Sequence, residues 1–388
     1  MSDILASVPS RPSWKTYWPD GLHIFVLVGF AVAQPLFDLL ARQAEFFIFQ
    51  NVARIDIIAL VAILSVLLPL GLVGVEGLIG LVSQRLRRWV HKVVLALGVA
   101  LTVLPAFHFF DSVQGIFLVY GALVLGTYTA LLYTFFRPVR MFFSLLSPAV
   151  LIFPALFLFT SPVFRVVFPA DASVPVERVR ITNPPPIIFI ILDEFPTTSL
   201  LNEHHQIDAA RYPNFAALAG DATWFRNATT VSDLTHYAVP AILTGNYPEP
   251  GRLPHAIDHP HNLFTLLVGT YDLNASGTLT HLCPTHLCPQ VRRPMWQRLS
   301  PLLSDLMVVY LHLLLPQDLR AELPSIAHRW KGFGDAPARG GPDEDHLKHS
   351  RHFIVQALSN RHRRQKLSDF VRTVQVTDRP KLYFLHSL

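Results

Sequence analysis

Two short segments carry the residue types from which a hydrolytic or group-transfer site can be built. Residues 187–194 form an apolar run that ends in two carboxylates, Asp193 and Glu194. About forty residues later, residues 235–245 begin with a hydroxyl group, that of Thr235. Carboxylates at the end of a strand can hold a metal ion, and a metal ion activates a neighbouring hydroxyl as a nucleophile. The carboxylate pair alone fits a helix cap or a turn equally well, but its combination with Thr235 favours an enzyme.

The pattern around these segments predicts an α/β domain. An apolar strand at 187–192 is followed by helix-like and strand-like stretches in alternation. They are a helix near 212–219, a strand edge at 224–226 and a helix from 235 to 243. Such alternation is typical of a mostly parallel sheet with helices on both faces. Ligands bind beyond the carboxyl ends of the strands in these sheets, which is where the two carboxylates fall.

The position expected for Thr235, near a helix N-terminus, also bears on its chemistry. The positive potential at a helix N-terminus attracts anions such as phosphate and sulfate groups. A metal ion held by Asp193 would lower the pKa of the Thr235 hydroxyl. We therefore expect Thr235 to attack an anionic ester.

The first part of the chain has the composition of a membrane domain. Hydrophobic residues make up 51% of the sequence and charged residues only 15%, and most of the apolar excess precedes residue 170. Five apolar runs lie there, each near the ~20 residues that a helix needs to cross the hydrocarbon core. They cover about 21–41, 56–82, 90–110, 113–136 and 141–169. We expect a transmembrane domain of five helices over residues 1–169.

Positive charges set the expected orientation of these helices. Basic residues lie between the second and third runs and between the fourth and fifth, whereas residues 107–112 contain no Lys or Arg. Basic connections face the cytoplasm. They contain Arg85, Arg87, Arg88, Lys92, Arg137 and Arg140. The N-terminus is then cytoplasmic, and the chain after residue 170 lies outside the cytoplasm.

Ionisable residues inside the apolar runs need partners, because an isolated charge in the membrane is costly. For Asp38 the alternatives are an interfacial position, a pair with Arg42 or a contact with a lipid headgroup. Glu76 lies toward the end of its run and is expected at the interface or against a headgroup.

The remaining chain divides at a proline-rich boundary. Residues 170–186 end in Asn-Pro-Pro-Pro, which cannot continue a helix, and we interpret them as a linker. Residues 187–388 form the extracytoplasmic domain in this interpretation. The apolar run 306–315 within it is too short to span a bilayer and predicts a core or interfacial helix. The net charge of +5 is spread over loops without a basic stripe, which argues against nucleic-acid binding.

The two cysteines of the chain, Cys283 and Cys288, are five positions apart. Outside the cytoplasm a disulfide is permitted, and it is the preferred interpretation. The alternative is a zinc site that combines both cysteines with His281 and His286.

The motifs of the second domain resemble those of the sulfatase-like branch of the alkaline-phosphatase superfamily. This branch includes membrane-anchored phosphoethanolamine and phosphoglycerol transferases, which also carry five spans before an exported domain. The similarity runs from about Pro186 to Pro248. It rests on 193–194 (Asp-Glu), 213–215 (Pro-Asn-Phe), 222–225 (Ala-Thr-Trp-Phe) and 243–248 (Leu-Thr-Gly-Asn-Tyr-Pro).

The resemblance implies roles for individual residues. Asp193, with Glu194, would bind a divalent metal ion, and Thr235 would be both the nucleophile and a metal ligand. His236 and His386 are weaker candidates for contacts with the ester. Zinc, manganese, magnesium and calcium all remain open as the metal. The protein would be a hydrolase or transferase of the bacterial inner membrane, with a periplasmic or extracellular catalytic domain and a phosphate- or sulfate-ester substrate, lipid or glycan.

Two departures from the family pattern shape this expectation. Sulfatases carry Cys or Ser where this chain has Thr235, whereas the phospho-transferring members use threonine. The family also completes its metal site with a later Asp-His pair, and this chain has no Thr-Ala-Asp-His-Gly type segment before it ends at Leu388. We therefore expect these 388 residues to be the front part of a longer protein. The alternative is a truncated, non-catalytic membrane protein with a binding or structural role.

Overall fold

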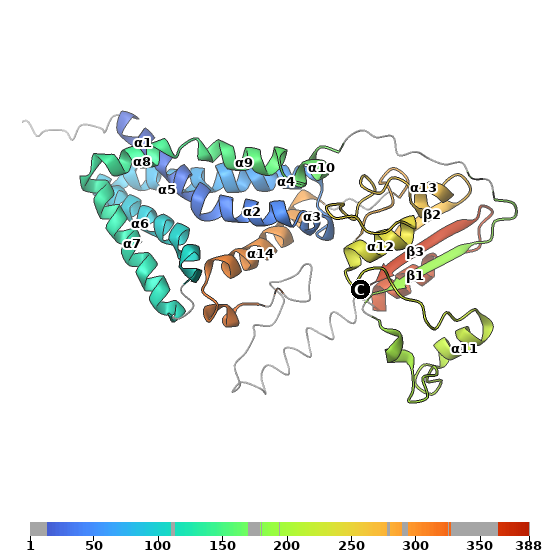
Figure 1. Cartoon of the computed structure of the whole chain (residues 1–388). Coiled ribbons are helices and arrows are strands. Elements are labelled where there is room, and N and C mark those ends of the chain that lie inside the picture. Colours follow the sequence, from blue (N-terminus) through green and yellow to red (C-terminus); the bar gives the residue numbers. More distant parts are fainter. Residues whose placement is uncertain are drawn as a thin grey trace, which may run out of the picture. The chain divides into compact units, whose positions relative to one another are not determined.

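The chain folds into two compact units in the computed structural model (Figure 1). Unit 1 comprises Met1–Phe46, Val52–Phe168 and Arg293–His352, and unit 2 comprises Phe47–Asn51, Pro169–Arg292 and Phe353–Leu388. The structure describes residues 14–109, 113–169, 179, 181–193, 195–277, 280–288, 294–324, 326 and 364–387. Unit 1 takes in Arg293–His352, a later segment that the sequence assigned to the second domain.

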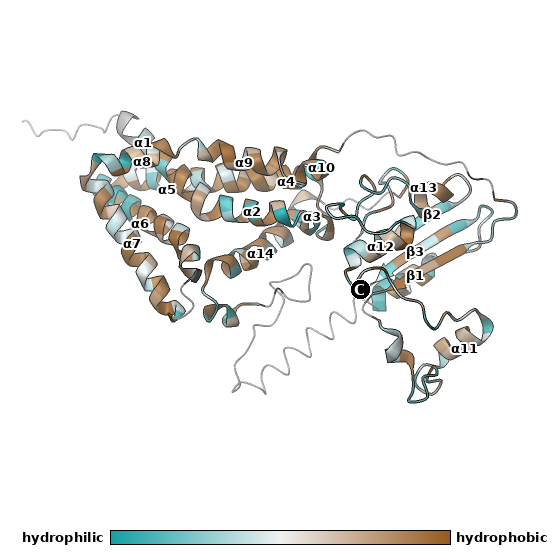
Figure 2. Cartoon of the chain, viewed as in Figure 1, coloured by the Kyte–Doolittle hydropathy of each residue, from teal (hydrophilic) through white to brown (hydrophobic). Residues whose placement is uncertain are grey.

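Unit 1 contains five helical segments that are long and apolar enough to cross a membrane. Their ribbons are mainly brown in the hydropathy colouring (Figure 2). They are Trp18–Arg42, Arg54–Val82, Gln84–Phe107, Gly115–Phe135 and Arg137–Phe159. The number agrees with the sequence-based expectation, and it suggests a multi-pass membrane protein.

Most of these spans are composites of shorter helices. The first joins α1 (Trp14–Val28), the π-helix η1 (Gly29–Ala33) and α2 (Gln34–Arg42); the second joins α4 (Arg54–Ala62), the π-helix η2 (Ile63–Leu67) and α5 (Leu68–Val82). The third and fourth are α6 (Gln84–Val103), continued by the 3-10 helix η3 (Leu104–Phe109), and α7 (Gly115–Phe135). The fifth contains α8 (Arg137–Leu145) and α9 (Ala149–Phe159), and α10 (Val163–Val167) follows it.

The ends of the spans differ from the sequence-based expectation in two ways. The basic residues expected in loops lie inside helices, because α6 begins directly after Ser83 and α8 directly after Phe136. Arginine is a good helix former, so a basic segment does not require a loop. The expected run 141–169 is broken before Pro148 and Pro162, because proline lacks the N–H group that would continue the helix.

Both ionisable residues noted in the apolar runs have protein partners. Asp38 pairs with Arg42 at 3.1 Å on an exposed surface. Glu76 is buried, and its two carboxylate oxygens lie 3.2 and 3.1 Å from Nδ1 of His91. Glu76 therefore forms a contact between the second and third spans.

The helix α14 (Met295–Leu314) packs in unit 1, although it follows most of unit 2 in the sequence. Arg298 donates to both carboxylate oxygens of the fully buried Asp56, at 2.7 and 2.9 Å. Tyr310 donates its hydroxyl to the carbonyl of Ala31 at 2.9 Å. The apolar run 306–315 predicted a helix with a buried face. These polar contacts place that helix in unit 1, and the spacing of apolar residues in the sequence does not predict them.

Unit 2 contains a three-stranded parallel sheet with the order β1-β3-β2. The strands are β1 (Ile187–Leu192), β2 (Asp272–Ser276) and β3 (Lys381–Ser387). The central strand β3 is covered on both faces. Leu382 and Phe384 pack in a core with residues of α12 (Thr235–Thr244) and α13 (Leu263–Leu267), and Tyr383 and Leu385 pack against Phe370.

Two details of the expected sheet are different in the structure. The sequence predicted a buried strand at 187–192, but β1 is the edge of the described sheet, and Ile188, Ile190 and Leu192 are 42–54% exposed. Residues 224–226, expected as a strand edge, form coil and turn, with Phe225 76% exposed. The expected helix near 212–219 is present as α11 (Pro213–Asp221).

The described chain also contains shorter elements. They are α3 (Glu45–Phe49) and the 3-10 helices η4 (Thr197–Leu200) and η5 (Leu319–Glu322). Of the expected linker, residues 170–178 and 180 lie outside the described residues.

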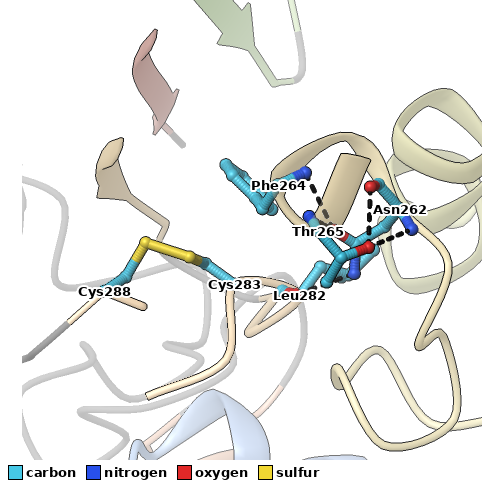
Figure 3. Close-up of a disulfide and its surroundings, with 6 residues drawn as sticks. All are labelled: Asn262, Phe264, Thr265, Leu282, Cys283 and Cys288. Carbon is cyan, nitrogen blue, oxygen red and sulfur yellow. Dashed lines mark hydrogen bonds between the residues drawn. A yellow bond between two sulfur atoms is a disulfide. The ribbon is translucent and has the colours of Figure 1, made fainter. Parts of the chain in front are cut away.

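Cys283 and Cys288 form a disulfide, with their Cα atoms 6.0 Å apart (Figure 3). This is the first of the two alternatives for these cysteines, and it excludes their use as zinc ligands. Asn262 ties the disulfide loop to α13, because its side chain accepts from the backbone N–H of Phe264 and donates to the carbonyl of Leu282 at 3.0 Å. The loop is therefore held to the helix that covers the sheet.

The Arg298–Asp56 pair gives a test of the packing of α14. We expect Arg298→Met to lower the free energy of unfolding by ~3 kcal/mol, because it leaves a buried carboxylate without its charged partner. The matched control is Arg42→Met, which breaks the exposed pair with Asp38 and should cost less than ~1 kcal/mol. Denaturant unfolding of the full chain in detergent measures both. Equal losses would show that α14 is not held through this pair.

His255 gives unit 2 a pH dependence with a defined sign. Burial lowers the pKa of His255 from its ordinary value of 6.5, and Asp258 opposes the shift. Its Nδ1 atom accepts from the N–H of Ile257 at 3.2 Å, which also requires the unprotonated ring. The folded state then binds fewer protons than the unfolded state below pH 6.5.

We therefore expect the stability of unit 2 to be fully present above pH 6.5 and to fall as the pH drops below that value. The slope that His255 contributes is at most ~1.4 kcal/mol per pH unit. Thermal unfolding at a series of pH values should show a shallower slope for His255→Gln and an unchanged slope for His204→Gln, whose side chain is 75% exposed. A slope that His255→Gln leaves unaltered would contradict the assignment.

Candidate functional site

Asp193 lies at the carboxyl end of the sheet, directly after β1. Its N–H donates to the carbonyl of Ser387 at 2.9 Å and so extends the pairing of β1 with β3 by one residue. This backbone bond fixes the point from which the carboxylate projects. The side chain of Asp193 is 18% exposed, so it is accessible to a ligand from one side.

Thr235 reaches the Asp193 carboxylate from the start of α12. Its Oγ1 atom donates to Oδ2 of Asp193 at 2.9 Å, across 42 positions of sequence. Thr235 is the first residue of the helix, after Leu234 in extended conformation. The N–H groups of Tyr237 and Ala238 bond back to the Leu234 carbonyl at 2.9 Å. The helix start is thereby anchored by the backbone, and the Thr235 side chain is left to contact the carboxylate.

His386 approaches the same carboxylate from β3. Its Nε2 atom lies 3.3 Å from Oδ2 of Asp193, and the residue is only 1% exposed. Because a carboxylate only accepts, the ring donates its Nε2–H. Burial lowers the pKa of His386, and the Asp193 carboxylate opposes that shift. One oxygen of Asp193 therefore accepts from both Thr235 and His386.

His236 follows Thr235 but takes part in aromatic packing. Its ring centre lies 4.3 Å from that of Tyr237 and 6.3 Å from that of Phe49. Phe49 belongs to Phe47–Asn51, the segment of unit 2 that comes from between the first two spans. His236 and Tyr237 also line a shallow hollow together with Thr244, Tyr247, Arg252 and His259.

The expected metal ion needs ligands at this edge of the sheet. Asp193 and Thr235 offer oxygen atoms to a cation, whereas Nε2 of His386 carries the proton that it donates to Asp193. Among the described residues, no three His, Cys, Asp or Glu side chains form a group that could hold a metal ion. Glu194, the other expected ligand, lies outside the described residues. Oxygen donors suit a hard divalent cation, but the donors described here do not enclose one without further ligands.

The sequence indicated some of these positions better than others. Asp193 and Thr235 were the strongest candidates, and the structure brings their side chains into contact. His386 was a weak candidate. It follows an apolar run, which predicts that it lies near the end of a strand, and this strand ends at the same edge of the sheet as Asp193. Phe49 was missed, because nothing in a loop between two membrane spans indicates a contact with a residue 187 positions away.

Comparison with known proteins gives no family model, no curated protein and no solved structure that matches this chain. The resemblance to sulfatase-like enzymes therefore stays a prediction that rests on the motifs of the sequence.

The contact between Asp193 and Thr235 can be measured without an activity assay. In a double-mutant cycle of Asp193→Asn and Thr235→Val, we expect a coupling free energy of ~1–3 kcal/mol, because the hydrogen bond has a charged acceptor. Denaturant unfolding of the four proteins gives the value. As a control, Thr235→Val combined with Asp208→Asn should be additive, since Asp208 bonds to the N–H of Arg211 instead. Additive losses for Asp193 and Thr235 would contradict the described geometry.

Proposed function

We propose that this protein is a membrane-anchored enzyme of the sulfatase-like class that cleaves or transfers a phosphate- or sulfate-ester group through Thr235. The observation that carries the proposal is the 2.9 Å hydrogen bond from the Thr235 hydroxyl to Asp193 at the first residue of α12. A hydroxyl bonded to a carboxylate has an acceptor for its proton when it attacks. Two residue types that the resemblance assigns to the chemistry meet at one edge of a parallel sheet.

The described residues support a two-step reaction. In the first step, Oγ1 of Thr235 forms a bond to the phosphorus or sulfur atom, the bond to the leaving oxygen breaks, and the hydroxyl proton passes to Oδ2 of Asp193. In the second step, the oxygen of water or of an acceptor hydroxyl forms a bond to the phosphorus or sulfur atom, and the bond to Oγ1 of Thr235 breaks. Oγ1 takes back the proton held by Oδ2 of Asp193, and the proton of the attacking hydroxyl passes through solvent to the leaving oxygen released in the first step. The N-terminus of α12 lies beside the reacting anion, and its positive potential favours the build-up of negative charge there.

His386 acts through Asp193 in this scheme. Its Nε2–H holds Oδ2 of Asp193 in place while Thr235 donates to the same oxygen. Because His386 is buried and bonded to the carboxylate, it is a positioning residue, and the substrate-binding role suggested by the sequence is not needed. His236, which follows Thr235 directly in α12, remains the candidate for a contact with the ester.

A divalent metal ion is part of the proposal by resemblance to the class. Asp193 and Thr235 are the described oxygen donors that would hold it, together with Glu194 and further ligands. Such an ion, when bound, lowers the pKa of a hydroxyl group and stabilises developing negative charge.

The location and substrate follow from the same proposal. In this proposal the N-terminus lies in the cytoplasm of a bacterium and unit 2 lies in the periplasm or outside the cell, since basic connections face the cytoplasm. Five apolar spans anchor the enzyme in the membrane, where it can reach the esters of lipid or glycan headgroups.

The covalent intermediate provides the test. Incubation of the full-length protein with a chromogenic phosphate or sulfate ester should add one phosphoryl or sulfuryl group to the peptide that contains Thr235, as read by mass spectrometry after acid quenching. We expect Thr235→Ala to abolish the adduct and to lower turnover by at least about 100-fold. Thr235→Ser, which keeps the hydroxyl, should still form the adduct. Thr229→Ala, at an exposed threonine outside the site, is the matched control.

Two results would contradict the proposal. One is turnover by Thr235→Ala at the rate of the unaltered protein. The other is the absence of both turnover and adduct when each of the four metal ions is added to the full-length protein, which would favour a binding or structural role.

A further inference from the structure

The five spans present one common end that contains most of their polar side chains. It consists of the starts of the first, third and fifth spans and the ends of the second and fourth, in residues 18–24, 74–92 and 130–147. Side-chain contacts join these segments directly. Asp20 contacts Arg87 of the third span at 3.0 Å and Tyr133 of the fourth at 3.4 Å, and His23 contacts Ser144 of the fifth at 2.9 Å. We call this region the basic end.

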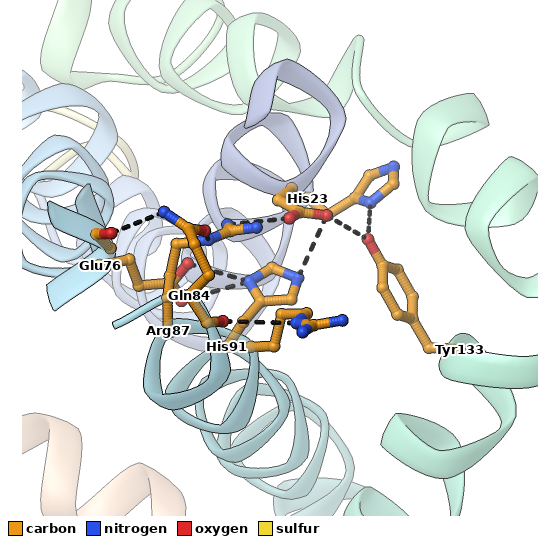
Figure 4. Close-up of polar contacts among 9 residues, drawn as sticks. His23, Glu76, Gln84, Arg87, His91 and Tyr133 are labelled. Atoms are coloured by element: carbon orange, nitrogen blue, oxygen red, sulfur yellow. Dashed lines mark hydrogen bonds and ion pairs between the residues drawn. The ribbon is translucent and has the colours of Figure 1, made fainter. Parts of the chain in front are cut away.

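The carboxylates of the basic end point inward. Asp20 and Glu76 are the only Asp or Glu residues in the three segments. Their side chains are 23% and 5% exposed, and they are bonded to Arg87 and His91 (Figure 4). Tyr133 extends the network to His23, whose Nδ1 atom lies 2.7 Å from the Tyr133 hydroxyl. The two carboxylates of this end are therefore bonded to partners inside the helix bundle.

The arginines that remain point outward. Arg85 and Arg88 on α6 and Arg137 and Arg140 on α8 are exposed, and none forms an ion pair with a carboxylate in the described part of the chain. Trp89 and Phe136 adjoin Arg88 and Arg137 in the sequence and are 67% and 54% exposed. Trp18, at the start of the first span, is 66% exposed. Exposed aromatic residues beside arginines at the ends of apolar spans are typical of the headgroup region of a bilayer.

The opposite ends of the spans show a different balance. There Arg42 pairs with Asp38 at 3.1 Å, and Asp56 pairs with Arg298 of α14 at 2.7 Å. Apart from the exposed Arg54, these acidic and basic groups are thus paired at that end, whereas the exposed charged groups of the basic end are all arginines. The difference is in how the charges are paired, so it cannot be read from the net charge of the chain.

We propose that the basic end binds the headgroups of anionic phospholipids through Arg85, Arg88, Arg137 and Arg140. A guanidinium group presents its donors in a planar fork that matches two oxygens of one phosphate. An anionic leaflet attracts each basic residue near its surface, whereas a zwitterionic headgroup has no net charge to attract. The occupant is a membrane lipid because these arginines begin helices that are apolar enough to lie in the same bilayer.

The test compares lipids that remain bound to the purified protein. The full chain is reconstituted in bilayers of equal parts phosphatidylcholine and phosphatidylglycerol, extracted in mild detergent and analysed by native mass spectrometry. We expect the unaltered protein to retain phosphatidylglycerol in several-fold excess over phosphatidylcholine. Arg85→Gln with Arg88→Gln, and likewise Arg137→Gln with Arg140→Gln, should each reduce this preference by about tenfold. The corresponding lysine variants should keep more than half of it.

The controls separate the proposal from non-specific effects. Arg42→Gln with Arg54→Gln removes two exposed arginines from the opposite ends and should leave the preference unchanged. Thr235→Ala should also leave it unchanged, which makes the result independent of the proposed enzymatic function. Millimolar inorganic phosphate should not displace the bound lipid.

Three outcomes would overturn the proposal. They are equal retention of the two lipids by the unaltered protein, an equal loss in the control pair at the opposite ends, and complete displacement by inorganic phosphate. If a glutamine variant does not fold, the unaltered protein and the lysine variants still decide the question, because equal retention in either contradicts the proposal.

Discussion

The parallel pairing of β1 with β3 is the constraint on which the candidate site depends. It places Leu192 opposite Ser387, so the residues that follow or end these strands share one edge of the sheet. Asp193 and His386 are 193 positions apart in the chain, yet they meet at one carboxylate oxygen because of this register. Shifting the register by one residue would turn His386 to the other face of β3. The covering of β3 on both faces is what holds that register.

Burial of polar groups organises both units by the same physical rule. A charge that leaves water must find a partner, and in this chain the partners come from distant segments. Asp56 receives Arg298 from a helix far along the chain, and Asp193 receives Thr235 and His386. These contacts are more specific than hydrophobic packing, since each requires one particular donor at one position. They explain why α14 belongs to unit 1 and why the start of α12 lies at the sheet edge.

The two proposals place different chemistry in the two units. In unit 2 a hydroxyl, a carboxylate and a buried imidazole converge at the edge of a sheet and beside a helix N-terminus, an arrangement suited to transfer of an anionic group. In unit 1 the carboxylates turn inward and the arginines outward, an arrangement suited to anionic lipid. Neither arrangement depends on the other, because they use residues of separate units.

The sequence by itself determined the features that depend on local pattern. Hydropathy predicted five spans, and the apolar run before Asp193 predicted β1, because both signals lie within neighbouring residues. The motif around Thr235 predicted a helix start, and α12 begins there. The tertiary structure alone decided the pairings between distant residues: His386 with Asp193, α14 with the spans, and Phe49 with His236. The periodicity of apolar residues predicts which face of a helix or strand is buried, but it does not predict which other element covers that face. The partner is selected by packing and by the cost of unpaired buried polar groups, and these depend on the whole fold.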